Sequence, residues 1–253
     1  MTRVTDLTEE IEWISRCHGN GDGETHMHLG QYLIEGSSGY VLVDAGEGHD
    51  AELNEEIEAA TGGAGIDVVL LTHSILPHTG NVAALKEAWE DATVIAAVGN
   101  PAAVGIDAEP SVTGETEEVA GATFTFIDPL ITDVVVSTWI YHHESSTLFT
   151  SEGVGHYHAP GECTHLSTDY EDGVPFEYVR AFAADKLKFL DFVDPEKLRI
   201  GFDNLLAEYD VERIAPTHGA PIERGDIERY ADTLARAAGE FDYEPTGVGG
   251  RSD

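Results

Sequence analysis

Basic side chains are scarce in this sequence of 253 residues. It holds 13 lysines and arginines against 48 aspartates and glutamates, which gives a formal net charge of −35 at pH 7. The only lysines are Lys86, Lys186, Lys188 and Lys197. Because neutralising nucleic-acid phosphates needs clustered Lys and Arg, we expect no nucleic-acid partner. The same shortage disfavours binding to an anionic membrane surface.

The acidic excess indicates the solvent in which the protein works. A disordered acidic chain would carry a similar charge, but here apolar strands alternate with amphipathic helices, which indicates a folded core beneath a carboxylate-coated surface. At low salt such a surface repels itself. Molar salt screens the carboxylates to within roughly 3 Å. We therefore predict a protein of a high-salt cytosol.

Long apolar runs are also absent. No apolar leader precedes residue 31, and no run approaches the roughly 20 residues that span a bilayer. We expect no membrane partner and a cytoplasmic location. The two cysteines, Cys17 and Cys163, are too few for a disulfide framework and have no CxxC spacing. We interpret them as ordinary reduced thiols.

Strand patterns followed by helical patterns occur twice along the chain. In the first half, strands are predicted at 11–17, 31–36, 40–46, 66–73 and 92–98, and helices at 49–63 and 80–91, before a turn-rich stretch from 99 to 121. In the second half, strands are predicted at 123–127, 134–141, 147–151 and 211–218, and helices at 176–192, 195–208 and 226–239. This order predicts an α/β fold, an αββα sandwich of two similar halves. We expect one domain over residues 1–242 and a disordered tail over 243–253.

Candidate metal ligands follow several of the predicted strands. His73 and His78 come after the strand at 66–73, Glu152 after the one at 147–151, and His218 ends "ERIAPTH". Strands that finish at one rim of a sandwich bring such side chains together. Imidazole with carboxylate suits zinc, iron or manganese. Alone, any one of these histidines is more simply a surface or capping residue.

The same segments resemble the metallo-β-lactamase superfamily. The strand "YVLVDAG" with Asp44, the loop "THSILPHTGN", the stretch "TLFTSEGVGHYH" and the segment "IAPTHGAPI" are similar to successive motifs of that family, in that order. Within it, the chain resembles the β-lactamase-like domain of flavodiiron proteins. The opening "CHGNGDGETHMHLGQYLI" and the stretch "STLFTSEGVGHYH" carry this closer likeness.

The resemblance implies a metal loop that is only partly kept. The family loop reads His-x-His-x-Asp-His, with Glu at the second ligand in flavodiiron proteins, whereas here it contains His73, Ile75, Pro77 and His78. Neither Ile75 nor Pro77 carries a donor atom, so two ligands are replaced. The bridging Asp of the family corresponds to Glu152, which is one methylene longer.

The ligand set that the resemblance implies is therefore His73, Asp133, His78, Glu152 and His218. It suits one ion in four-coordinate geometry better than two. His156 is a further candidate, because Gly153 and Gly155 beside it give the loop freedom to turn inward. Other histidines available to compensate for the replaced ligands are His18, His26, His28, His142, His143 and His158. The implied cofactor is non-haem iron, one or two ions, or zinc.

Three functions remain open. The first is a flavodiiron-like metal protein that binds or reduces dioxygen or nitric oxide, a gas substrate, as an oxidoreductase. The second is a metal-dependent hydrolase of the thioesterase or lactonase type, in which the metal activates a water for attack on a small-molecule ester. Pro77 counts against it, because the family Asp that it replaces holds the second metal. The third is a metal-free binding module with a vestigial site, in which apolar side chains fill the emptied space.

The likeness also implies partners. Flavodiiron proteins usually carry an FMN-binding flavodoxin domain after this one, and we expect no FMN domain in this chain. A separate flavoprotein or a rubredoxin-like protein is then expected to deliver the electrons. The oligomeric state stays open, because the flavin domain is what makes dimers necessary in that branch.

Overall fold

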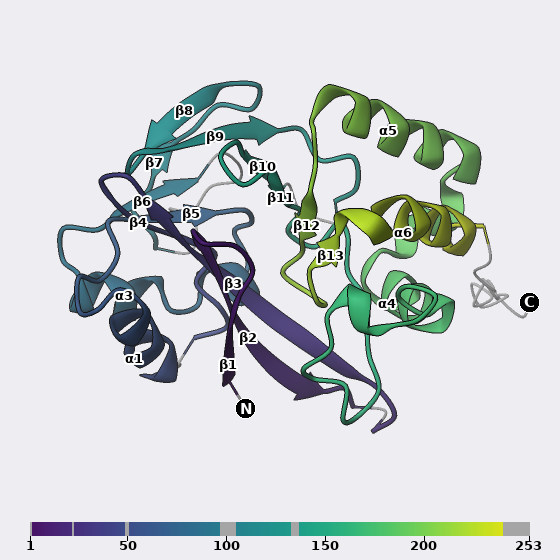
Figure 1. Cartoon of the computed structure of the whole chain (residues 1–253), viewed down its shortest axis with the longest axis horizontal. Coiled ribbons are helices and arrows are strands. Elements are labelled where there is room, and N and C mark those ends of the chain that lie inside the picture. The colour runs from purple at the N-terminus through teal and green to yellow at the C-terminus, as the bar shows by residue number, and fades with distance from the viewer. Residues whose placement is uncertain (1, 22, 49–50, 97–104, 133–136, 240–253) are drawn as a thin grey trace, which may run out of the picture.

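Two β-sheets lie face to face with helices outside both of them (Figure 1). The structure is a computed structural model and describes residues 2–21, 23–48, 51–96, 105–132 and 137–239. The predicted αββα sandwich is confirmed. The expected tail at 243–253 lies outside the described residues, as does part of the strand expected at 134–141.

The first sheet has the strand order β1-β2-β3-β4-β5-β6-β7. Strands β1 to β4 are antiparallel neighbours, and β4 to β7 run parallel. Their bounds are Thr2–Asp6 for β1, Ile11–Gly19 for β2, His26–Gly36 for β3, Gly39–Val43 for β4, Val68–Leu71 for β5, Thr93–Ala96 for β6 and Glu109–Pro110 for β7. The hairpin of β2 and β3 extends well beyond the shorter strands of its sheet (Figure 1).

The second sheet has the order β13-β12-β11-β10-β9-β8. Only β11 and β12 pair in parallel; the other neighbours are antiparallel. The bounds are Thr116–Val119 for β8, Ala122–Ile127 for β9, Trp139–His142 for β10, Thr147–Phe149 for β11, Arg213–Ala215 for β12 and Ile222–Glu223 for β13. Strands β7 and β8 lie within the stretch that the sequence predicted as turns.

Helices cover the outer face of each sheet. The helices on the side of the first sheet are α1 at Ala51–Ala60, α2 at Leu76–Thr79 and α3 at Val82–Ala88. Those on the side of the second sheet are α4 at Phe176–Lys186, α5 at Pro195–Glu208 and α6 at Arg224–Ala237. Within the part of the chain that the structure describes, 3₁₀ turns lie at Ser167–Asp169 and Lys188–Phe192. The helix predicted at 176–192 therefore ends at Lys186, and the second 3₁₀ turn takes up the rest of that range.

Alternation along the strands divides the core into layers. In β4, Val41 and Val43 pack between the sheets against Phe124 and Phe149, whereas Leu42 packs outward with Leu53 of α1. Successive side chains of a strand point to opposite faces, so a strand that is apolar throughout is buried on both sides. A third cluster joins the second sheet to α4, α5 and α6.

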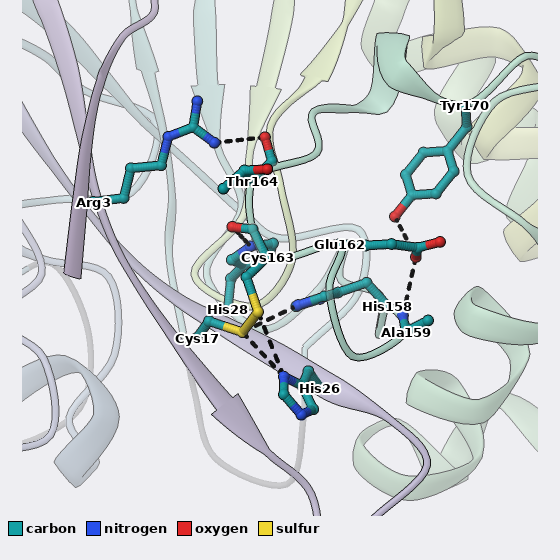
Figure 2. The surroundings of a disulfide bond; sticks show 10 residues. All are labelled: Arg3, Cys17, His26, His28, His158, Ala159, Glu162, Cys163, Thr164 and Tyr170. Carbon is teal, nitrogen blue, oxygen red and sulfur yellow. Dashed lines mark hydrogen bonds between the residues drawn. A yellow bond between two sulfur atoms is a disulfide. The ribbon is translucent and has the colours of Figure 1, made fainter. Parts of the chain in front are cut away.

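Cys17 and Cys163 form a disulfide between β2 and the loop that precedes the 3₁₀ turn at Ser167–Asp169 (Figure 2). The expectation of two reduced thiols is wrong for this structure. The two cysteines are 146 positions apart in the chain, so no local spacing could pair them. The fold brings them together because the long β2–β3 hairpin reaches the loop after Glu152.

Across the described ranges, no helix combines the length and the apolar character needed to cross a bilayer.

Candidate metal centre

The candidate ligands lie where parallel strands end. Asp44 follows β4 directly, His73 follows β5, Glu152 follows β11 and His218 follows β12. Because β4 pairs in parallel with β5, and β11 with β12, the carboxyl ends of each pair lie at the same edge. The two edges meet at one rim of the sandwich.

Two histidine side chains, His78 and His218, converge on one carboxylate oxygen of Glu152. Oε1 of Glu152 lies 3.0 Å from Nε2 of His78 and 3.0 Å from Nε2 of His218. The three residues are 4%, 0% and 3% exposed, in that order. One donor atom from each lies within 4.8 Å of the others, which makes the group a candidate metal-binding set.

Asp44 fixes the orientation of the His78 ring. Its Oδ2 lies 2.7 Å from Nδ1 of His78 and accepts hydrogen bonds from the hydroxyls of Thr72 at 2.7 Å and Thr217 at 3.0 Å. Its Oδ1 accepts from the Thr72 backbone N–H at 2.9 Å. A carboxylate bonded to Nδ1 directs Nε2 at the centre, as is usual for histidines that bind metals.

The His218 ring is held in the same way by a backbone carbonyl. Its Nδ1 lies 3.3 Å from the carbonyl oxygen of His28, which also points Nε2 toward Glu152. Both candidate ligand histidines therefore have Nδ1 engaged by an acceptor, while Nε2 faces the carboxylate.

Two residues at the centre have positive φ without being glycine. Asp44 has φ of 61° and Ser151, which precedes Glu152, has φ of 52°. Side chains with a Cβ seldom adopt this region, and such strain of about 1–3 kcal/mol is found most often at functional sites. The hydrogen bonds of Asp44 hold its backbone in place.

Neighbouring groups of opposite charge shift the pKa values of His78 and Glu152. Burial alone would lower the pKa of His78, but the charge of Asp44 and hydrogen bonds to Asp44 and Glu152 outweigh it and raise that pKa to about 10. Burial would raise the pKa of Glu152, but the charge of His218 and hydrogen bonds from His218 and His78 hold it well below its usual range. Without an ion, a protonated His78 therefore bridges two carboxylates.

His73 is buried beside this group but does not join it. Its ring centroid lies 5.1 Å from that of His78, and its Nδ1 accepts the backbone N–H of Ser74 at 2.9 Å. It is not a member of the three-residue donor set. Ile75 and Pro77, which replace two family ligands, supply no donor atom.

The two remaining candidates are placed elsewhere. Asp133 lies outside the described residues. His156 is buried, and its Nε2 accepts the backbone N–H of Ala220 at 3.3 Å, so it does not face the centre. Of the other histidines, His26 and His158 lie at the disulfide, His142 bonds to Ser145, His143 bonds to Thr125, and His18 is exposed.

We expect His156 to make the metal-free protein sensitive to acid. Burial, and then the charges of His28 and His158, lower the pKa of His156 to about 3 from its usual 6.5. Between these values the unfolded chain binds a proton that the folded chain does not, so stability falls as the pH drops. From pH 6.5 to about pH 5 this costs about 2 kcal/mol.

Urea unfolding at the two pH values, in molar KCl with a chelator, measures this loss. His156→Gln keeps an oxygen near the Ala220 N–H but cannot titrate. Its loss of stability over the same range should be smaller by about 2 kcal/mol. Equal losses in the two proteins would show that His156 does not titrate as described.

Sequence reasoning missed the residues that orient the ligands. Asp44 was predicted only as part of the strand motif "YVLVDAG". Neither Thr72 nor Thr217 was predicted to belong to the site. A signal was present, because each threonine directly precedes a histidine of the candidate set, in "TH" at 72–73 and again at 217–218. In both pairs the threonine hydroxyl donates to Asp44.

A cavity of about 620 Å³ borders the loop that contains His78. It is lined by residues 74–77 and by parts of α2 and α3, among others. None of the three donor residues lines it. It therefore does not open onto the His78–Glu152–His218 group.

The donor set fits one metal ion. Two imidazole nitrogens and one carboxylate match the 2-His-1-carboxylate set of non-haem iron, and also the His₂Glu set of catalytic zinc. The engaged Nδ1 atoms and the burial of all three donors are what such a site requires. A second ion does not fit as well, because Ile75 and Pro77 have no donors.

Comparison with known proteins shows the family. The model of the metallo-beta-lactamase superfamily matches residues 31–172, more than half of the chain. The chain belongs to the metallo-β-lactamase superfamily. No protein in the curated comparison matches it.

Solved structures add the likeness to flavodiiron proteins. A mutant of the flavo di-iron protein from Thermotoga maritima superimposes with a TM-score of 0.72 at 18% identity, over 94% of this chain and 62% of that one. Rubredoxin oxygen:oxidoreductase from Desulfovibrio gigas gives 0.69 at 19%, over 93% and 61%. A metallo-beta-lactamase from Pontibacter korlensis gives 0.63 at 15%, over 93% and 99%. The chain thus spans about three fifths of the two flavodiiron structures, whose β-lactamase-like domain it resembles.

Proposed function

We propose that this protein binds one non-haem iron ion through His78, Glu152 and His218 and uses it to bind or reduce dioxygen or nitric oxide. The observation that carries the proposal is the convergence of two oriented Nε2 atoms on one buried carboxylate oxygen. This donor set is typical of non-haem Fe(II) proteins that handle dioxygen, because it leaves coordination positions open. When bound, ferrous iron would supply the electron that a gas ligand needs.

The chain's own residues would bind and orient the ion. Asp44 keeps the proton of His78 at Nδ1 and leaves Nε2 for the ion. Because the pKa of His78 is raised to about 10, binding would displace one proton from this ring near neutral pH. Burial of the three donors would exclude bulk water from the reacting gas.

The likeness to rubredoxin oxygen:oxidoreductase supports an external electron donor. We propose a separate flavoprotein or a rubredoxin-like protein in this role. We also propose a high-salt cytosol as the location, on the basis of the net charge of −35, and a single domain over residues 1–242.

A metal-free binding module is the second candidate. His78, protonated between Asp44 and Glu152, already supplies a positive charge where an ion would sit, and the hydrogen bonds of the group are satisfied without one. A hydrolase is less well supported, because Pro77 stands in place of the family Asp that holds the second metal.

Metal content decides between these candidates. We would purify the protein without a histidine tag, in molar KCl and with its disulfide closed, reconstitute it with ferrous iron or zinc, and measure bound metal by plasma mass spectrometry. We expect about one iron per chain and a change in the spectrum of the ferrous protein when nitric oxide is added.

Each other outcome argues for a different function. A tight zinc ion with no response to nitric oxide would favour the hydrolase. No metal after reconstitution would favour the binding module. Two irons per chain would mean that residues beyond this group complete a binuclear site.

A further inference from the structure

A second group of metal-binding side chains surrounds the disulfide, away from the candidate metal centre. It consists of Cys17 on β2, His26 on β3, and His158 and Cys163 in the loop that leads to residue 167. One donor atom from each lies within 4.8 Å of the others. Figure 2 shows both imidazoles pointing at the sulfur atoms.

Backbone pairing holds the two histidines in place. The N–H of His26 donates to the His158 carbonyl at 2.8 Å, and the N–H of His158 donates to the His26 carbonyl at 3.0 Å. The antiparallel register of β2 and β3 then places Cys17 near His26, because Cys17 lies opposite His28. The four side chains are therefore positioned by the main chain as well as by the disulfide.

The nitrogen–sulfur distances suit a tetrahedral ion. Nδ1 of His26 lies 3.3 Å from Sγ of Cys17 and 3.4 Å from Sγ of Cys163, and Nε2 of His158 lies 3.3 Å from Sγ of Cys17. Zinc bonds of about 2.3 Å to sulfur and 2.0 Å to nitrogen put neighbouring ligands about 3.5 Å apart in a tetrahedron. The two sulfur atoms, which are bonded in the disulfide, must separate to admit an ion.

Neighbouring residues support the ligands from outside. The His28 ring stacks on that of His158 at 4.1 Å between centroids, and its Nε2 lies 2.9 Å from the Cys163 carbonyl oxygen. The guanidinium of Arg3 donates to the Thr164 carbonyl at 2.6 Å. These contacts fix both the His158 ring and the backbone at Cys163 and Thr164 (Figure 2).

We propose that Cys17, His26, His158 and Cys163 form a zinc site when the disulfide is reduced, so that the same residues alternate between a disulfide and a Cys₂His₂ metal site. Two thiolates and two imidazoles in tetrahedral arrangement select zinc among the common cellular metals. Burial of His158, with the other three half-buried, leaves a path for the ion.

The exchange between the two states needs a two-electron reductant, for which we take a dithiol. Two electrons and two protons pass from the dithiol to the Cys17–Cys163 bond, the S–S bond breaks, and the dithiol becomes a disulfide. The two thiols that form lose their protons as Zn²⁺ binds both thiolates and both imidazoles. Oxidation reverses these steps and releases the ion.

Either state ties the β2–β3 hairpin to the loop after Glu152. In a reducing cytosol, where thiols stay reduced, zinc would therefore replace the disulfide as the link between these segments. The site shares no ligand with the His78–Glu152–His218 centre, which contains no sulfur.

Zinc and cobalt binding by the full-length protein test the proposal. The tag-free protein would be reduced anaerobically with a phosphine, because a dithiol would itself bind zinc, and titrated against a chromophoric chelator. We expect one more zinc per chain after reduction than before it. Cobalt in place of zinc should give a thiolate-to-metal charge-transfer band, which a site without sulfur cannot produce.

Single substitutions distinguish the proposed zinc ligands from residues that only lie beside them. His26→Ala keeps both cysteines, and thus the disulfide-closed fold, yet should weaken zinc binding more than the 10–100-fold typical of outer residues. His28→Phe, which removes the bond to Cys163, should weaken it about 10-fold. His18→Ala, an exposed residue beside Cys17, should leave it unchanged.

The proposal is overturned if the reduced protein takes up no more zinc than the oxidised one, or if its cobalt spectrum lacks the sulfur band. Equal losses in His18→Ala and His26→Ala would overturn it as well. Repeating the titration in His218→Ala keeps this outcome separate from that of the proposed iron site, since the sulfur band should persist in that variant.

Discussion

Replacing His218 with Ala is expected to abolish most iron binding at the candidate metal centre. The substitution removes one of the three donor atoms, a histidine nitrogen, and leaves only Glu152 and His78 as ligands. Loss of a direct ligand should exceed the 10–100-fold cost of losing an outer residue. We would measure iron content by plasma mass spectrometry and affinity by competition with a chelator, with the disulfide closed throughout.

His142→Ala is the matched control for this prediction. His142 is also a buried histidine, 1% exposed, but it pairs with Thr147 at the start of β11, the end of that strand away from Glu152, and bonds to Ser145 rather than to any of the three donors. Its replacement should leave iron content unchanged. Equal effects of the two substitutions, or none from either, would remove the proposed site.

Asp44→Asn separates orientation from ligation. The amide keeps the shape of Asp44 but lacks its charge, so it holds the His78 ring less firmly and no longer raises its pKa. Iron affinity should fall 10–100-fold, less than in His218→Ala, as expected for a residue that acts through a ligand. A loss as large as that of His218→Ala would mean that Asp44 itself binds the ion.

The fold was predictable because the strands carry their own positional signal. The segment "YVLVDAG" is apolar on both faces, and the structure indeed buries Val41 and Leu42 in different layers. Such a strand belongs in the middle of a covered sheet. The positions of Glu152 and His218 followed from the same reasoning, since each is the third residue after a buried strand.

The details of the site were less predictable, because they depend on residues far apart in the chain. His73 and His78 looked equivalent in the loop, but the turn into α2 directs only His78 at Glu152. The pairing of Cys17 with Cys163 and the place of His26 and His158 beside them depend on the length of the β2–β3 hairpin. The sequence suggested a start for that strand at residue 31, whereas β3 begins at His26. The five additional residues, 26–30, include His26, which is a ligand of the proposed zinc site.

Gly80→Ala is expected to destabilise the protein and to disturb the candidate metal centre. Gly80 has φ of −60° and ψ of −34°, which any residue adopts, so its backbone does not require glycine. A Cβ there would lie well inside contact distance of the Glu47 carbonyl group and the Gly48 nitrogen. Backbone atoms cannot move aside as a flexible side chain can. We expect a loss of about 3 kcal/mol in the free energy of unfolding, the upper part of the range for overpacking.

The clash at Gly80 also affects the metal ligands, because the loop after β4 is hydrogen-bonded to α2. The N–H of Gly80 donates to the Gly46 carbonyl at 2.8 Å, and the N–H of Ala45 donates to the His78 carbonyl at 2.7 Å. Pushing these two segments apart lengthens the Asp44–His78 contact that orients the ring, so iron affinity should fall together with stability.

Gly225→Ala serves as the control, because Gly225 is exposed near the start of α6 and a Cβ there meets nothing within 4 Å. That change should be neutral or stabilise the protein by up to about 1 kcal/mol. A stable Gly80→Ala protein with unchanged iron affinity would show that the loop between β4 and α1 yields freely, and that the position of Asp44 does not depend on close packing against α2.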